Sequence, residues 1–233
     1  MAASLGLIVP TTNTVNELEW KRMALPEMRF PLVRMALHAH GDEALYRDLQ
    51  KAIEELKPRN PDVIAYACTA GSMVQPLDSL AAWIEKQSGI KGVATAPALV
   101  YACRALGLQR IALATPYHDA LNEHEKHFFE ENGVRVLAMK GLGIGAGGPH
   151  EYVRIARVPK DVVYDHCRSV DVPEAQGLVV SCTDFPALEA IPPLEAGLSK
   201  PVISSNLATF WQALRTAGVV TRIAGFGRLL EFH

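Results

Sequence analysis

The sequence lacks the patterns that carry metal, membrane or nucleic-acid chemistry. Its four cysteines form no CxxC pair and its eight histidines form no HExxH motif, so we expect no zinc site. No apolar run approaches the roughly 18 residues that a membrane-spanning helix needs. The formal net charge is only −2, so we expect no nucleic-acid or anionic-membrane partner.

A secretion signal is also missing from the first residues. The opening "MAASLGLIVP" has no basic segment before its apolar run, and the run stops at Pro10, so it predicts a first strand. We therefore expect a cytoplasmic protein. In that reducing compartment thiols are free by default, and a cysteine with a special role is more often catalytic than disulfide-bonded.

What the sequence does have is a regular alternation of short apolar runs with longer helical patterns. Continuous apolar runs of this kind are typical of parallel strands covered by helices on both faces, which predicts an α/β fold. The expected strands are 5–9, 63–67, 93–94, 110–114, 134–138, 178–181 and 202–204. The expected helices are 43–56, 77–87, 98–106, 121–131, 159–169, 185–198 and 207–217.

The pattern of the first half returns in the second half. The stretch "LGLIVPTTNT" has a counterpart in "LQRIALATPYHD", and "VIAYACTAG" has one in "GLVVSCTDF", at nearly constant offset. This period is far too long for a solenoid. It predicts two similar lobes related by a pseudo-twofold axis, each a parallel sheet flanked by helices, with the active site between them. We assign residues 1–95 plus 206–233 to one lobe and 96–205 to the other.

Two cysteines occupy matching places, each at the end of an apolar run. Cys68 precedes a turn into a helix start, where backbone N–H groups lower the pKa of a thiol. Cys182 is followed closely by Asp184, whose charge opposes thiolate formation. We therefore expect Cys68 to act as nucleophile or base and Cys182 as acid; the alternative is that both are small core side chains. Cys103 and Cys167 lie within helical patterns and are predicted to be structural.

Uncharged polar residues follow the first strand of each half. Thr12 and Asn13 could bind a carboxylate or form a turn with a helix N-cap, and the sequence leaves both readings open. Tyr117 stands at the equivalent place in the second half, where it could face the cleft or pack in the core.

The stretch "GLGIGAGGPH" at 141–150 contains GxGxxG spacing. No strand is expected directly before it and GK[ST] is absent, so we predict a mobile loop over the cleft rather than a nucleotide site. His150 stays a candidate. His124, His127 and His166 are expected on solvated helix faces.

With these residues in view, the sequence resembles the aspartate/glutamate racemase superfamily, most closely its maleate cis–trans isomerase and arylmalonate decarboxylase branch. "VPTTNT" is similar to the VPSSNT of the isomerases, and "YACTAG" and "SCTDFPALEAIP" resemble the two cysteine motifs. Amino-acid racemases usually have an acidic residue in the first loop and a histidine after the second Cys-Thr, where this chain has Asn13 and Asp184. Arylmalonate decarboxylases lack the first cysteine, so Cys68 favours the isomerase pattern.

The resemblance implies a cofactor-independent enzyme, with no metal, that acts on a small carboxylate. Cys68 would add to the double bond of maleate, and Cys182 would donate and retrieve a proton. The residues implied to bind the substrate are Thr12, Asn13, Thr69, Ala70, Tyr117 and Thr183. We also expect a homo-oligomer. The alternatives are a racemase or decarboxylase acting next to a carboxylate, or a non-catalytic two-lobed binding module.

Overall fold

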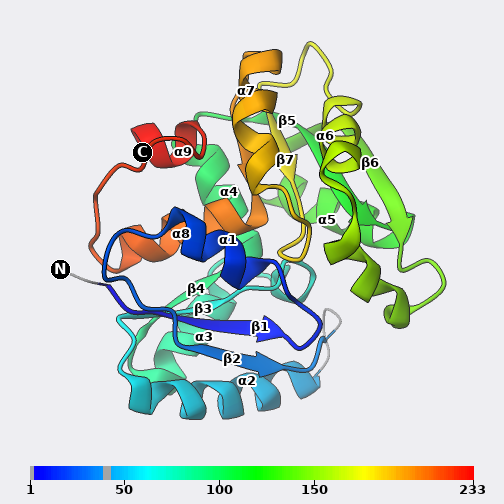
Figure 1. Ribbon diagram of the computed structural model, residues 1–233. Helices are drawn as coiled ribbons and strands as arrows, with labels where there is room; N and C mark the ends of the chain where they lie inside the picture. The colour runs from blue at the N-terminus through cyan, green and yellow to red at the C-terminus, as the bar shows by residue number, and fades with distance from the viewer. Residues whose placement is uncertain (1–2, 39–42) are drawn as a thin grey trace.

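The strands form two separate parallel sheets with the same internal order. The computed structural model describes residues 3–38 and 43–233. The first sheet has the order β2-β1-β3-β4 and the second β6-β5-β7-β8, so each half of the chain repeats one topology (Figure 1). The strands are β1 (Leu5–Pro10), β2 (Leu32–Met35), β3 (Val63–Tyr66), β4 (Lys91–Ala94), β5 (Arg110–Tyr117), β6 (Arg135–Ile144), β7 (Gly177–Val180) and β8 (Val202–Ser204).

Helices cover both faces of the sheets, as the continuous apolar strands predict. The α-helices are α1 (Asn16–Met23), α2 (Glu43–Leu56), α3 (Ser79–Ser88), α4 (Thr95–Ala105), α5 (Asp119–Glu131), α6 (Lys160–Arg168), α7 (Ile191–Leu198), α8 (Ser205–Thr216) and α9 (Arg228–Phe232). Four short 3-10 helices are also described: η1 (Lys57–Arg59), η2 (Ala70–Ser72), η3 (Pro149–Arg157) and η4 (Leu188–Ala190).

Two apolar clusters hold the first sheet, one on each face. Side chains alternate along a strand, so Leu7 and Val9 point into one cluster and Ile8 into the other. The outer cluster joins the sheet to α2 and α3. The inner cluster is continuous with the core of the second lobe and contains buried residues of α4 and α8. These two helices pack against each other and connect the sheets (Figure 1).

The structure confirms the α/β class and the two similar sheets, and it corrects several elements. Strand β2 and helix α1 were not expected. The expected helix over 185–198 is divided, because α7 begins only at Ile191, with prolines in its first turn. Strand β6 continues to Ile144 into the glycine-rich stretch, which was expected to be loop. The lobe boundaries stay a prediction.

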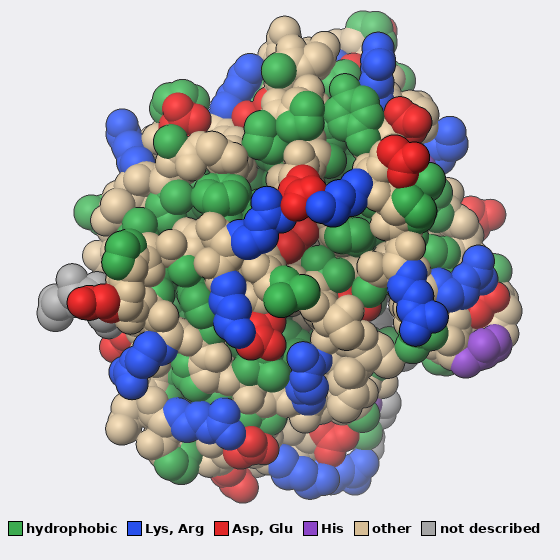
Figure 2. Space-filling model, in the orientation of Figure 1, with side chains coloured by type: hydrophobic (Ala, Val, Ile, Leu, Met, Phe, Trp, Pro, Cys, Tyr) green, Lys and Arg blue, Asp and Glu red, His purple; other side chains and the backbone are tan. Residues whose placement is uncertain are grey.

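The charged side chains on one face of the protein are mixed in sign (Figure 2). None of the described helices combines the length and apolar character needed to cross a bilayer. Basic and acidic side chains are intermixed on the face shown in Figure 2, with no broad field of either sign. The carboxyl ends of β3 and β7, one in each sheet, lead directly to Cys68 and Cys182.

Candidate active site

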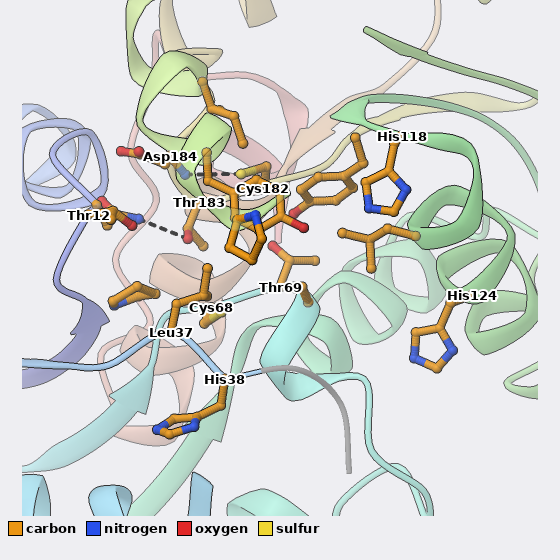
Figure 3. A pocket seen from close by; sticks show the side chains of 18 of the residues that line it. Thr12, Leu37, His38, Cys68, Thr69, His118, His124, Cys182, Thr183 and Asp184 are labelled. Atoms are coloured by element: carbon orange, nitrogen blue, oxygen red, sulfur yellow. Dashed lines mark hydrogen bonds between the residues drawn. The ribbon is translucent and has the colours of Figure 1, made fainter. Parts of the chain in front are cut away.

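One cavity brings together all eight residues predicted from the sequence. It has a volume of about 430 Å³ and receives residues from both halves of the chain. The predicted residues in its wall are Thr12, Asn13, Cys68, Thr69, Ala70, Tyr117, Cys182 and Thr183. Cys68 and Cys182 approach it from different elements (Figure 3). The cysteine pair is thus a feature of the folded chain, and neither thiol is confined to the core of its own lobe.

Cys68 follows β3 and opens the first cysteine loop, residues 68–72. The backbone N–H of Gly71 donates to its sulfur at 3.4 Å, and the Ser72 hydroxyl donates to its carbonyl oxygen at 2.6 Å. These contacts bend the chain into η2 directly after the cysteine. The sequence correctly predicted a turn here.

The predicted acidity of Cys68 is wrong for the resting protein. Burial raises the pKa of this thiol, and this effect outweighs the stabilisation of the thiolate by Gly71 N–H and by the Tyr66 hydroxyl. The Tyr66 hydroxyl is buried beside the sulfur, and within the described residues it has no hydrogen-bond partner. It can therefore donate to the sulfur once a thiolate forms. Sequence reasoning missed Tyr66 because it lies inside a strand pattern.

Cys182 follows β7 and opens the second cysteine loop, residues 182–184. The backbone N–H of Asp184 donates to its sulfur at 3.4 Å, as Gly71 does for Cys68. Its φ angle is 90°, a left-handed conformation that is costly for a residue with a β-carbon and that is often found at functional sites.

The electrostatics of Cys182 keep it protonated. Burial is the largest effect that raises its pKa, and the carboxylate of Asp184 and a charge on Cys68 raise it further, against a hydrogen bond from Tyr117. A charge on Cys68 is therefore felt at the sulfur of Cys182. This environment agrees with the expected role of Cys182 as an acid.

Asp184 lies in the cavity wall but its carboxylate serves the opposite lobe. Its Oδ1 accepts the backbone N–H groups of Thr14 at 2.7 Å and Val15 at 3.2 Å. Burial raises its pKa to about 6, although these two bonds favour the charged form. Asp184 thus joins the start of α1 to the second cysteine loop.

Asn13 and Thr183 are tied to each other across the cleft. Asn13 Nδ2 donates to Thr183 Oγ1 at 3.0 Å, and the Thr183 hydroxyl donates to the carbonyl oxygen of Ala67 at 3.1 Å. Asn13 Oδ1 accepts backbone N–H groups of Val15 and Asn16, which closes a turn just before α1. The turn reading is therefore confirmed, but the N-cap of α1 is Val15 rather than Asn13. Binding of a carboxylate by Asn13 stays a prediction.

Part of the cavity wall consists of apolar and aromatic side chains that sequence reasoning missed. It contains Leu37 after β2, Leu121 on α5, and Tyr152 and Ile155 on η3. These residues carry no chemical signature, and only the fold brings them together. They give the cavity room for an apolar substituent.

Two of the three histidines expected on solvated helix faces lie elsewhere. His166 is buried, and its Nε2 lies 2.9 Å from the carbonyl oxygen of Thr115, so it is not solvated. His124 lies in the cavity wall, together with His38 and His118. His127 is exposed as expected. His150 is exposed and does not line the cavity, whereas its neighbour Pro149 does.

The glycine-rich stretch is braced by a side chain from η3. Glu151 Oε2 accepts the backbone N–H groups of Gly145 at 2.8 Å and Gly147 at 3.2 Å. Glu151 therefore ties the stretch to η3, three residues of which line the cavity. A nucleotide-binding role gains no support from this arrangement.

Two further observations limit the chemistry of the site. Within the described ranges, no group of three or more His, Cys, Asp or Glu residues could hold a metal ion. Cys103 and Cys167 are buried in α4 and α6 and are absent from the cavity wall. The cavity wall thus holds a pair of thiols with backbone N–H and hydroxyl donors around them. Such a pair can add to a double bond or transfer protons to and from a carbon atom.

Comparison with known proteins gives consistent matches along the chain. A model of the arylmalonate decarboxylase family matches residues 5–230. The maleate isomerase of Nocardia farcinica is 29% identical over 243 residues, which cover 97% of this chain and 95% of that protein. The arylmalonate decarboxylase of Bordetella bronchiseptica is 28% identical over 237 residues, which cover 98% of this chain and 96% of that protein.

Solved structures of the same enzymes share the fold. A cysteine-to-serine mutant of the Nocardia farcinica maleate cis–trans isomerase, with a covalently bound succinylcysteine intermediate, has a TM-score of 0.89 at 26% identity and covers both chains completely (100%). A crystal structure of arylmalonate decarboxylase has a TM-score of 0.83 at 28% identity, covering 97% of this chain and 98% of that chain.

Proposed function

Because this chain belongs to the arylmalonate decarboxylase family, we propose that it is a cofactor-independent enzyme that isomerises a small cis-unsaturated dicarboxylate of the maleate type with its cysteine pair. The observation that carries the proposal is the presence of two thiols, one from each half of the chain, in the wall of one cavity. Relatives named maleate isomerase and the relative with a succinylcysteine intermediate support it.

Cys68 is the nucleophile in this proposal. Its thiol first releases a proton to solvent. The thiolate then adds to one alkene carbon of maleate, and the electron pair of the double bond moves toward the carboxylate on the other carbon. Cys182 gives its proton to that second carbon, which leaves a succinyl group bonded to the Cys68 sulfur. A double bond has then become a single bond, about which rotation is easy.

The return path regenerates both thiols in their starting states. After rotation, the Cys182 thiolate takes back a proton from the carbon that it protonated, and the Cys68–carbon bond breaks to leave fumarate. The Tyr66 hydroxyl and Gly71 N–H stabilise the departing Cys68 thiolate, while Tyr117 and Asp184 N–H stabilise the Cys182 thiolate during the intermediate. Asn13, Thr69 and backbone N–H groups hold the substrate carboxylates.

A second candidate function is racemisation or decarboxylation at a carbon next to a carboxylate. It is favoured by the apolar wall of Leu37, Leu121, Tyr152 and Ile155, which has room for a substituent that maleate lacks. In this reaction Cys182 protonates a carbanion after loss of CO₂, or the two thiols exchange a proton on opposite faces of one carbon.

Proton NMR separates these functions. The enzyme is mixed with maleate, with aryl-substituted malonates, and with amino acids and aryl-substituted carboxylates in D₂O. We expect fumarate from maleate. Release of CO₂ from a malonate, or deuterium entering the α-position without fumarate formation, assigns the second function. Absence of turnover with every compound contradicts both and favours a binding protein.

A further inference from the structure

Ser205 lies between the two cysteine loops, although neither loop contains it. It is the first residue of α8, at the point where the chain leaves β8, and its side chain is completely buried. Its Oγ accepts the backbone N–H of Cys182 at 3.0 Å and lies 2.9 Å from Thr69 Oγ1. One hydroxyl therefore joins the residue after the first cysteine to the amide of the second cysteine.

The direction of these hydrogen bonds follows from what each group can do. The Cys182 N–H can only donate, so Ser205 Oγ accepts there. Either hydroxyl could donate in the bond between Ser205 and Thr69. We take Ser205 as the donor, since within the described residues its proton has no other hydrogen-bond partner. Thr69 Oγ1 then acts as acceptor in that bond and keeps its own proton. Thr69 lines the cavity (Figure 3), so this proton is available to a ligand there.

Thr183 provides a contrast that makes the arrangement specific. Its hydroxyl accepts from Asn13 and donates to the Ala67 carbonyl oxygen, so its proton is already used within the protein. Of the two threonines that follow the cysteines, only Thr69 therefore has a hydroxyl proton to offer. Hydrogen bonds in series also strengthen one another, which makes the Thr69 hydroxyl a better donor.

We propose that Ser205 is a positioning residue that fixes the spacing of the two cysteine loops and turns the Thr69 hydroxyl proton toward a substrate carboxylate. This inference rests on the proposed function, because it assigns the Thr69 proton to a carboxylate of the substrate. The bond to the Cys182 amide holds the loop that contains the strained φ angle. Ser205 itself touches no substrate atom.

A double-mutant cycle tests this role. Ser205→Ala and Thr69→Val are each expected to lower kcat/KM by roughly tenfold, because each breaks the same series of hydrogen bonds. The double variant is expected to lose about as much as the worse single variant. If the loss of kcat/KM in the double variant equals the product of the two single losses, the residues act independently and the proposal is overturned.

Thr209→Val is the matched control on the same helix. Thr209 is also fully buried, and its hydroxyl bonds to Thr95 and to the Ser205 carbonyl oxygen rather than to a cysteine loop. This variant is expected to keep kcat/KM close to wild type. A loss equal to that of Ser205→Ala attributes the effect to general damage to α8 and overturns the proposal.

Thiol alkylation gives a readout that needs no turnover. The rates at which iodoacetamide modifies Cys68 and Cys182 are measured site by site by mass spectrometry. Both rates are expected to change severalfold in Ser205→Ala and to stay unchanged in Thr209→Val. If Ser205→Ala does not fold, Thr69→Val breaks the series from its other end and is expected to change the Cys182 rate. Unchanged alkylation rates in Ser205→Ala overturn the proposal. If the rates change in Ser205→Ala but the wild-type protein converts none of the substrates, only the proposed function is contradicted.

Discussion

The two cysteine loops are built alike and differ in charge. Each follows the third strand of its sheet, each thiol accepts one backbone N–H at 3.4 Å, and each has a tyrosine hydroxyl beside it. The loops differ in that Cys182 has the Asp184 carboxylate as a near neighbour and a φ angle of 90°, whereas no carboxylate contributes to the ionisation of Cys68. The repeat supplies two similar thiols, and one carboxylate makes them unequal.

This difference assigns the two chemical roles. A thiol that is harder to ionise gives up its proton only to a strong base such as a carbanion, which suits an acid. Cys68 has hydrogen-bond donors beside its sulfur and no adjacent carboxylate, so it is the better candidate for the thiolate that attacks carbon. The comparison therefore predicts that equivalent substitutions in the two loops have unequal consequences.

The largest expected effect is removal of either sulfur. Cys68→Ala and Cys182→Ala are each expected to lower kcat/KM for maleate isomerisation by on the order of 10³-fold or more, because the residues act as a unit. Cys103→Ala, which removes a buried thiol from α4, is the control and is expected to remain active. Full maleate isomerisation by Cys68→Ala, with loss only in Cys182→Ala, would contradict the role of Cys68 as the nucleophile.

The next effect comes from closing the space next to the first sulfur. A β-carbon on Gly71 would overlap the Tyr66 hydroxyl and lie 3.3 Å from Cys68 Sγ, so Gly71→Ala is expected to displace the thiol. We expect kcat/KM to fall by roughly 100-fold, since small misplacements of a reacting group are costly. Gly197→Ala in α7 meets only an ordinary contact at 3.7 Å and should preserve activity. Wild-type kinetics in Gly71→Ala would show that the geometry of this loop is not critical.

Removing each tyrosine hydroxyl in turn is expected to change the alkylation rate of only one of the two cysteines. Tyr66→Phe is expected to slow alkylation of Cys68 at about pH 8 by roughly tenfold, and Tyr117→Phe to slow that of Cys182, because each thiolate loses a hydrogen-bond donor. Tyr66→Phe should not destabilise the protein, since the lost hydroxyl is unpaired within the described residues. If one variant slows alkylation of both thiols equally, each tyrosine does not act on its own cysteine, and the assignment is wrong.

The smallest expected effect concerns stability and the buried carboxyl behind the second loop. Glu125 accepts from Ser181 Oγ at 2.6 Å, and burial raises its pKa to about 7 from 4.5. The folded protein therefore holds a proton that the unfolded chain has already released, and the stability this provides is lost as pH rises through about 7. In Glu125→Gln the loss of unfolding free energy between about pH 5 and pH 8 should shrink by on the order of 2 kcal/mol.

Urea unfolding of the two proteins at both pH values measures this difference. Glu123→Gln, on an exposed position of the same helix, is the control and should behave as wild type. An unchanged pH slope in Glu125→Gln would mean that the buried carboxyl does not hold its proton.

The sequence predicted the repeated halves and the two cysteines because these depend on local order, and the resemblance to a family added the other six cavity residues. A strand that ends in Cys-Thr places its cysteine at a sheet edge, and a repeated strand order brings two such edges to one cleft. It could not predict Tyr66 or Ser205. Tyr66 matches any apolar strand residue, and the contacts of Ser205 span 23 residues to Cys182 and 136 to Thr69.

The thiol acidity was mispredicted for a related reason. The turn after Cys68 supplies the expected N–H donor, but the sequence does not show how deeply the sulfur is buried, and burial is the larger effect on its pKa. The same holds for His166, whose charged neighbours in sequence gave no sign that the ring packs inward. Homo-oligomer formation stays a prediction.

The division of labour between the sulfurs is tested most directly by trapping the covalent intermediate. Cys182→Ser is incubated with maleate, and the intact protein and its peptides are weighed by mass spectrometry. The account predicts a mass increase equal to one molecule of maleic acid, located on Cys68 and absent from Cys68→Ser. Fumarate formation by wild-type protein, with no adduct on Cys68 in the trapped variant, would contradict it.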